Sequence, residues 1–108
     1  PLAINIAPRA PRIIQVGNYG VIVNQDGRLA IPGGRPARPG EAITIYAVGL
    51  GATSPAVPTG AGAPATEPLA RVVAPPRVIL GNAFIGAQVL NPLFVGLTPG
   101  LVGLYQVN

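Results

Sequence analysis

Apolar and polar residues alternate over short stretches of this chain, and glycine or proline ends each stretch after a few residues. Such alternation is typical of a half-buried β-strand, whereas a helix needs an apolar period of about 3.6 residues. The clearest example spans residues 41–48, which place Ile43, Ile45 and Ala47 on one face. No segment of helical length keeps a helical period without an internal Gly or Pro, so the pattern predicts strands joined by turns.

Turn residues divide the rest of the chain into comparable pieces. Asn24-Gln25-Asp26-Gly27 separates a strand at residues 19–24 from one at residues 28–31, and its Asp-Gly pair is typical of a hairpin turn. Thr98-Pro99-Gly100 leads in the same way into a last strand at residues 101–108. This spacing predicts an all-β fold, a β-sandwich of about seven to nine short strands of Greek-key type.

The chain is expected to consist of a short N-terminal segment followed by one main domain. Residues 1–12 combine an alternating strand at residues 2–6 with a proline-rich connector that cannot join a continuous ladder of backbone hydrogen bonds. Residues 13–108 are expected to form the sandwich. Residues 52–66 lack any periodicity, and a loop of that length is either functional or lies across a neighbouring molecule.

The amino-acid inventory argues against an enzyme. The chain contains no His and no Cys, and all seven of its cationic side chains are Arg. Nucleophilic and acid–base catalysis therefore lack their usual groups, and zinc, iron or copper would lack imidazole and thiolate ligands. The three carboxylates, Asp26, Glu41 and Glu67, stand in different local contexts, which does not favour a two-carboxylate site. We expect no catalytic residues, no cofactor, no metal and no small-molecule substrate.

Charge adds little to this picture. The net charge is +4, and the arginines are spread thinly without interleaved aromatic residues that would stack on bases. We expect no nucleic-acid partner, and we expect Arg35 and Arg38 to pair locally with Glu41. The long uncharged stretch after Arg77 contains Asn, Gln, Pro and Gly, so no transmembrane segment is expected.

An ordered set of motifs resembles a known family. Val21-Ile22-Val23-Asn24-Gln25-Asp26-Gly27 is followed by Ala37-Arg38-Pro39-Gly40-Glu41 and Ile45-Tyr46-Ala47-Val48-Gly49-Leu50-Gly51, and the chain closes on Leu97-Thr98-Pro99-Gly100-Leu101-Val102-Gly103-Leu104-Tyr105-Gln106-Val107-Asn108. Together they resemble the Solibacter-type uncharacterised C-terminal domain of bacterial secreted and cell-surface proteins. The resemblance implies an Ig-like sandwich and a secreted or cell-surface location, and it implies no catalytic residues.

Too few charges are present to cover the outer faces of a two-layer sandwich, so we expect the chain to assemble with copies of itself. The leading hypothesis is a non-catalytic extracellular subunit of a bacterial surface filament or similar assembly. The alternative is a carbohydrate- or protein-binding module at the C-terminus of a larger secreted protein. The strand at residues 2–6 either folds back on its own domain or adds to a neighbour's sheet. The residues expected to mediate self-assembly are Leu2, Ile4, Ile6, Tyr46, Leu101, Tyr105 and Val107.

Overall fold

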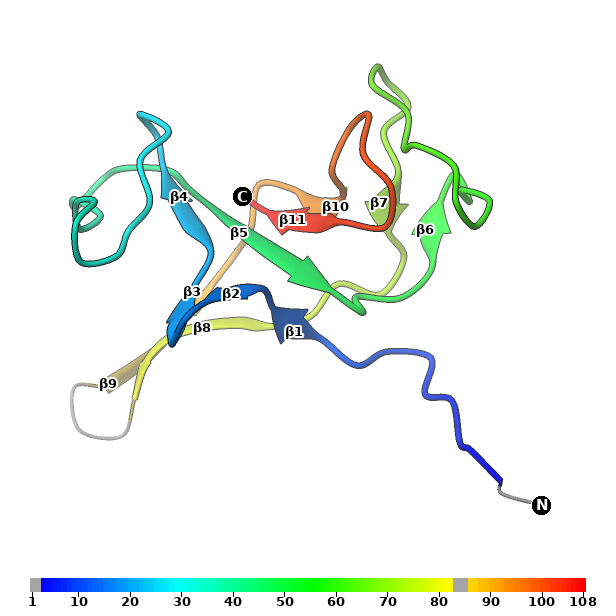
Figure 1. Ribbon diagram of the computed structural model, residues 1–108, viewed down its shortest axis with the longest axis horizontal. Coiled ribbons are helices and arrows are strands. Elements are labelled where there is room, and N and C mark those ends of the chain that lie inside the picture. The colour runs from blue at the N-terminus through cyan, green and yellow to red at the C-terminus, as the bar shows by residue number, and fades with distance from the viewer. Residues whose placement is uncertain (1–2, 83–85) are drawn as a thin grey trace.

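The structure is a computed structural model that describes residues 3–82 and 86–108. Figure 1 shows an all-β chain, as predicted, and the described residues contain no helix. The strands are β1 (Arg12–Ile13), β2 (Gln15–Val16), β3 (Tyr19–Gly20), β4 (Ile22–Asn24), β5 (Ile43–Val48), β6 (Thr53–Ser54), β7 (Arg71–Val72), β8 (Val78–Asn82), β9 (Gly86–Leu90), β10 (Val95–Leu97) and β11 (Tyr105–Val107).

Seven of these strands form the main sheet, in the order β1-β5-β11-β10-β7-β6, with β4 also paired to β5. All pairs are antiparallel. β5 pairs with three strands, because β11 follows one of its edges while β1 and β4 share the other. Between β1 and β4 the chain leaves this edge as the β2–β3 hairpin, which turns at Gly17 with a φ of +59°.

The pairing register places the apolar side chains of the main sheet on one face. Tyr105 lies opposite Ala47, and Val107 lies opposite both Ile45 and Val95. Two clusters of buried residues form on this side of the sheet. One contains Ala47, Leu50, Val72 and Val107, and the other contains Ala63, Ala70 and Leu97.

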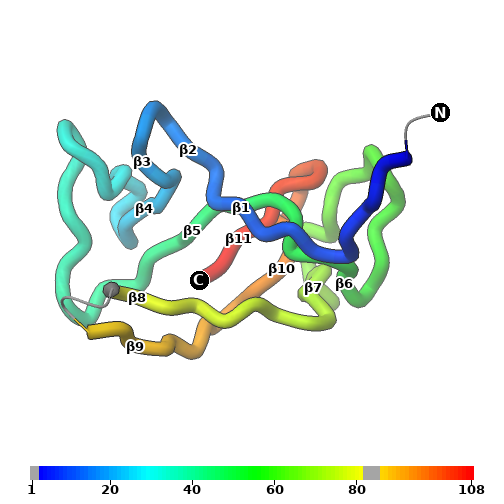
Figure 2. The backbone as a smooth tube through the Cα atoms, turned by 90° about the horizontal axis from the view of Figure 1, so that it is seen from below, coloured from blue at the N-terminus to red at the C-terminus, as the bar shows by residue number. Residues whose placement is uncertain are grey.

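The β8–β9 hairpin lies against this apolar face and belongs to neither of the other sheets (Figure 2). Val78 is its contact with the first cluster. Beyond that contact the hairpin carries exposed apolar side chains, namely Ile79, Leu80, Val89 and Leu90. The arrangement is compatible with a β-sandwich whose second layer, within the described residues, consists of this hairpin.

The strand boundaries differ from the predicted ones where the backbone bends. Eleven strands are described instead of seven to nine, and five of them have only two residues each. The predicted strand at residues 19–24 is divided into β3 and β4, and β6 lies within the segment 52–66, which was predicted to be a loop. Residues 28–31 contribute a single bridge between Leu29 and Val23. The last strand begins at Tyr105 and not at Leu101, since residues 101–103 are bent and Gly103 has a φ of +67°. The long segment 52–66 packs on its own chain, where Ala63 is buried and donates its backbone N–H to the Leu101 carbonyl.

Candidate self-assembly surface

The N-terminal arm, residues 3–7, does not form the predicted strand. It runs away from the body of the molecule in Figure 1. The side chains of Ile4 and Ile6 are 77 % and 91 % exposed. A strand needs a neighbouring edge to satisfy its backbone groups, and residues 3–7 pair with no strand among the described residues. The prediction at Leu2 lies outside the described residues.

The connector, residues 8–11, is fixed to the body at two points. The Ala10 N–H donates to the Gly49 carbonyl at 2.9 Å, and the Arg9 guanidinium donates to the Ala74 carbonyl at 2.9 Å. Gly49 and Gly51 make this crossing possible. A Cβ at Gly49 would overlap the Ala10 carbonyl, and one at Gly51 would lie 2.7 Å from the Arg9 side chain. The sequence pattern indicates only that glycine ends the stretch at residues 41–48.

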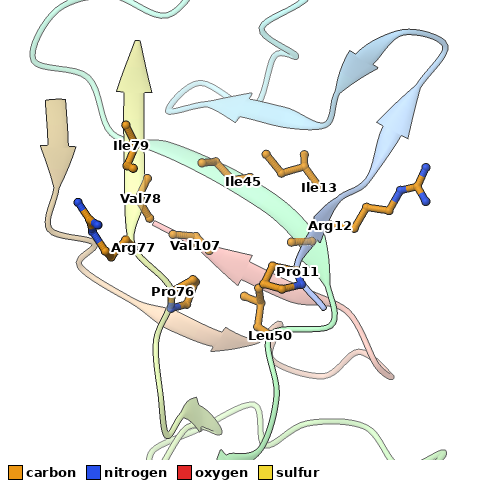
Figure 3. A pocket seen from close by; sticks show the side chains of 11 residues that line it. Pro11, Arg12, Ile13, Ile45, Leu50, Pro76, Arg77, Val78, Ile79 and Val107 are labelled. Carbon is orange, nitrogen blue, oxygen red and sulfur yellow. The ribbon is translucent and has the colours of Figure 1, made fainter. Parts of the chain in front are cut away.

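An apolar groove of about 410 Å³ lies between β8 and β1. Figure 3 shows Ile45 and Val107 of the main sheet, and Leu50 just after β5, between these two strands, where they form the floor of the groove. Val78 and Ile79 line the β8 side, and Ile13 lines the β1 side together with Pro11 and Arg12.

The groove continues past Val78 into a second hollow of about 250 Å³. Ile45, Val78 and Val107 line both spaces, so a single row of apolar residues connects them. Within residues 3–82 and 86–108, β8 pairs with β9 alone, so its other edge carries backbone groups that no strand of the chain satisfies. An unpaired strand edge beside an apolar floor is suited to the addition of one more strand.

The residues predicted for self-assembly do not form one surface. Ile4, Ile6 and Leu101 are exposed, and Tyr46 is half-buried on the face of β5 opposite the core. Tyr105 and Val107 face the interior of their own chain, and Val107 also lines the groove. Val107 is buried in the first cluster, and the half-buried Tyr105 packs against both clusters and donates its hydroxyl to the Gly51 carbonyl at 2.6 Å.

Both residues lie on the same face of the last strand. A strand over residues 101–108 was expected, but β11 begins at Tyr105, and its pairing turns Tyr105 and Val107 to the core and Gln106 to the opposite face. The residues that line the β8 side of the groove were missed. Short apolar stretches between turn residues predict strands, but they do not show which strand edge stays unpaired.

A cluster of charged side chains lies near the N-terminal end of β5. Arg35 donates to Asp26 at 2.7 Å and to Glu41 at 2.9 Å, and the side chains of Arg35 and Glu41 are only 13 % and 10 % exposed. The Arg35 prediction is therefore confirmed, whereas Arg38 contributes its backbone N–H at 2.9 Å. Asp26 and Glu41, which were expected to stand in different local contexts, are both bound by this one guanidinium.

The hydrogen bonds from Arg35 lower the pKa of Glu41 to about 2 from its ordinary 4.5, with a further contribution from the Arg38 N–H. A lowered carboxylate pKa stabilises the fold above the ordinary value and loses that contribution as pH falls. We therefore expect the urea midpoint to decrease between pH 4.5 and pH 2.

Glu41→Gln should flatten this decrease, whereas Glu67→Gln, at a carboxylate that is paired but exposed, should leave most of it. If the urea midpoint decreased equally with pH in the wild type and in Glu41→Gln, the prediction would be contradicted.

Among residues 3–82 and 86–108, no group of three His, Cys, Asp or Glu side chains is placed to bind a metal ion. Nor does the described part of the chain contain a helix with the length and apolarity to cross a membrane. Comparisons with protein-family models, curated proteins and solved structures find no match to this chain. The resemblance to the Solibacter-type domains therefore stays a prediction.

Proposed function

We propose that this protein is a non-catalytic structural subunit that assembles with copies of itself into an extracellular filament or a similar polymer. The observation that carries the proposal is the unfinished second layer over the main sheet. The β8–β9 hairpin covers only part of the apolar face and exposes Ile79, Leu80 and Val89. A two-stranded hairpin is marginal in water by itself, so a contact from another copy would stabilise it.

The amount of exposed surface supports this proposal. The chain exposes 7662 Å². A compact monomer of 10.9 kDa would expose about 5,600 Å². The excess of roughly 2,000 Å² is larger than the roughly 800 Å² that each partner contributes to a standard interface. The chain therefore has enough surface for two contacts, which is what a subunit within a filament needs.

The remaining parts of the proposal rest on the sequence. The absence of His, Cys and Lys supports a non-catalytic role. The extracellular setting is supported by the resemblance to domains of secreted and cell-surface proteins. With two different contact surfaces, one for each neighbour, the subunits add head to tail, and such contacts extend into a fibre when the rotation between subunits does not close a ring.

Sedimentation velocity and electron microscopy of the purified chain over a range of concentrations test this proposal. We expect the sedimentation coefficient to rise with concentration and elongated particles to appear. A monodisperse monomer at every concentration would overturn the proposal. Selective binding of the monomer to one glycan on an array would instead favour the alternative, a carbohydrate-binding module.

A further inference from the structure

Resting on this proposed self-assembly, we infer that the groove between β8 and β1 accepts the N-terminal arm of a second copy. In this arrangement residues 3–7 of one subunit form an added strand along the unpaired edge of β8 in the next. The added strand gives the second layer a third member, β9-β8-arm. It also covers the floor formed by Ile45, Leu50 and Val107.

The arm has the side-chain pattern that such a strand needs. Residues two apart share a face of a strand, so Ile4 and Ile6 would point together into the groove while Asn5 faces away from it. The flanking residues, Ala3 and Ala7, are small. β8 has five residues, and the arm supplies five to pair with them.

Charge favours the same occupant. Arg12 and Arg77 lie at the two sides of the groove, and Figure 3 shows their guanidinium groups pointing away from its floor. Residues 3–7 carry no charged side chain, so they enter between these arginines without repulsion. An apolar floor offers no partner for a charged segment.

The connector, residues 8–11, keeps the arm away from the groove of its own chain, so the groove of a neighbouring copy is the one available to it. Arg9 and Ala10 are bound to the Ala74 and Gly49 carbonyls, and Pro8 and Pro11 limit the backbone on either side. Both views place the N-terminal end of the arm away from β8 and β9 (Figures 1 and 2). The exposed Ile4 and Ile6 therefore have no route to the groove of their own chain while the connector keeps these contacts.

Two complementary variants test the inference. Ile4→Asp/Ile6→Asp removes a functional donor, and Ile79→Asp places a charge in the acceptor groove. All three side chains are more than half exposed, so the fold should tolerate the changes. We expect each variant alone to stay monomeric. An equimolar mixture should form a one-to-one dimer and no polymer, because only one donor and one acceptor remain intact.

Matched controls carry the same added charge outside the groove. Asn5→Asp changes the opposite face of the arm, and Val102→Asp changes an apolar side chain that is 58 % exposed and lines neither hollow. Both should polymerise like the wild type. Polymers of either the donor or the acceptor variant, or a mixture without the dimer, would overturn the inference but not the proposed function. A wild type that stays monomeric overturns both.

Hydrogen exchange gives a readout that does not depend on a variant. Alternate backbone amides of β8 point to its unpaired edge, so they should exchange rapidly in the dilute monomer and slowly in the polymer. Circular dichroism identifies any variant that has unfolded, and the wild-type exchange result then decides the inference. Unchanged exchange in β8 upon polymerisation would place the arm elsewhere.

Discussion

Leu50→Ala is expected to lower the free energy of unfolding by about 2–5 kcal/mol, the range for removing a buried leucine side chain. Leu50 is 2 % exposed and packs with Ala47, Val72 and Val107 in the first cluster. The backbone around it has little freedom to close the resulting cavity, because the connector crosses it through the bond from Ala10 to Gly49. In the described residues only seven apolar side chains are buried, so this loss is a large share of the core.

Urea denaturation, monitored by circular dichroism, measures this loss. The midpoint should decrease, while the dependence of the free energy of unfolding on urea concentration should not change. Leu93→Ala is the matched control, since it is the same chemical change at a side chain that is 85 % exposed. Surface substitutions of this kind stay within about 0.5 kcal/mol. If the two variants lost the same stability, Leu50 would not be part of the core.

Gly96→Ala is expected to cost about 3 kcal/mol or more, at or above the usual range for overpacking. Gly96 lies in β10 opposite Arg71 of β7. A Cβ there would overlap the Ala70 carbonyl and lie 2.7 Å from the Phe94 ring. The Ala70 carbonyl accepts the Leu97 N–H at 2.9 Å, so moving it away would also break a backbone hydrogen bond beside the second cluster.

The control for this substitution is Gly62→Ala, another glycine without a positive φ. Its Cβ would come no closer than 3.3 Å to a neighbour, the Gly100 carbonyl. Because alanine also restricts the unfolded chain, we expect a change of less than about 1 kcal/mol. Thermal unfolding of the two variants side by side measures the difference, and a stable Gly96→Ala would mean that β7 and β10 are not packed so closely.

Local sequence chemistry predicted several elements correctly. The Asn24–Gly27 turn forms as expected, with a φ of +85° at Gly27 and a bond from the Gly27 N–H to the Asn24 carbonyl at 2.9 Å. Thr98-Pro99-Gly100 likewise closes a turn through the Leu101 N–H. The alternation in residues 41–48 corresponds to β5, the longest described strand. In each case the deciding forces act within a few residues of each other.

Predictions that depended on distant partners were less successful. Val107 was expected to contact another copy from an outer face, but pairing with Ile45 and Val95 turns it to the core side, where it also lines the groove. Asp26 and Glu41 were thought to be in separate surroundings, but the loop between them brings Arg35 to both. Neither outcome is visible in residue types, because each requires the register of strands and loops far apart in the chain.

By itself the sequence determined that this chain is all-β, where its main turns lie, and which side of β5 is apolar. Alternation and turn residues specify these features because a strand's two faces and a turn's dihedral angles are local properties. Only the tertiary structure decided that, within the described residues 3–82 and 86–108, the arm lies outside every sheet and one edge of β8 stays unpaired. Which edges meet depends on how the whole chain packs, since any strand edge offers the same backbone donors and acceptors.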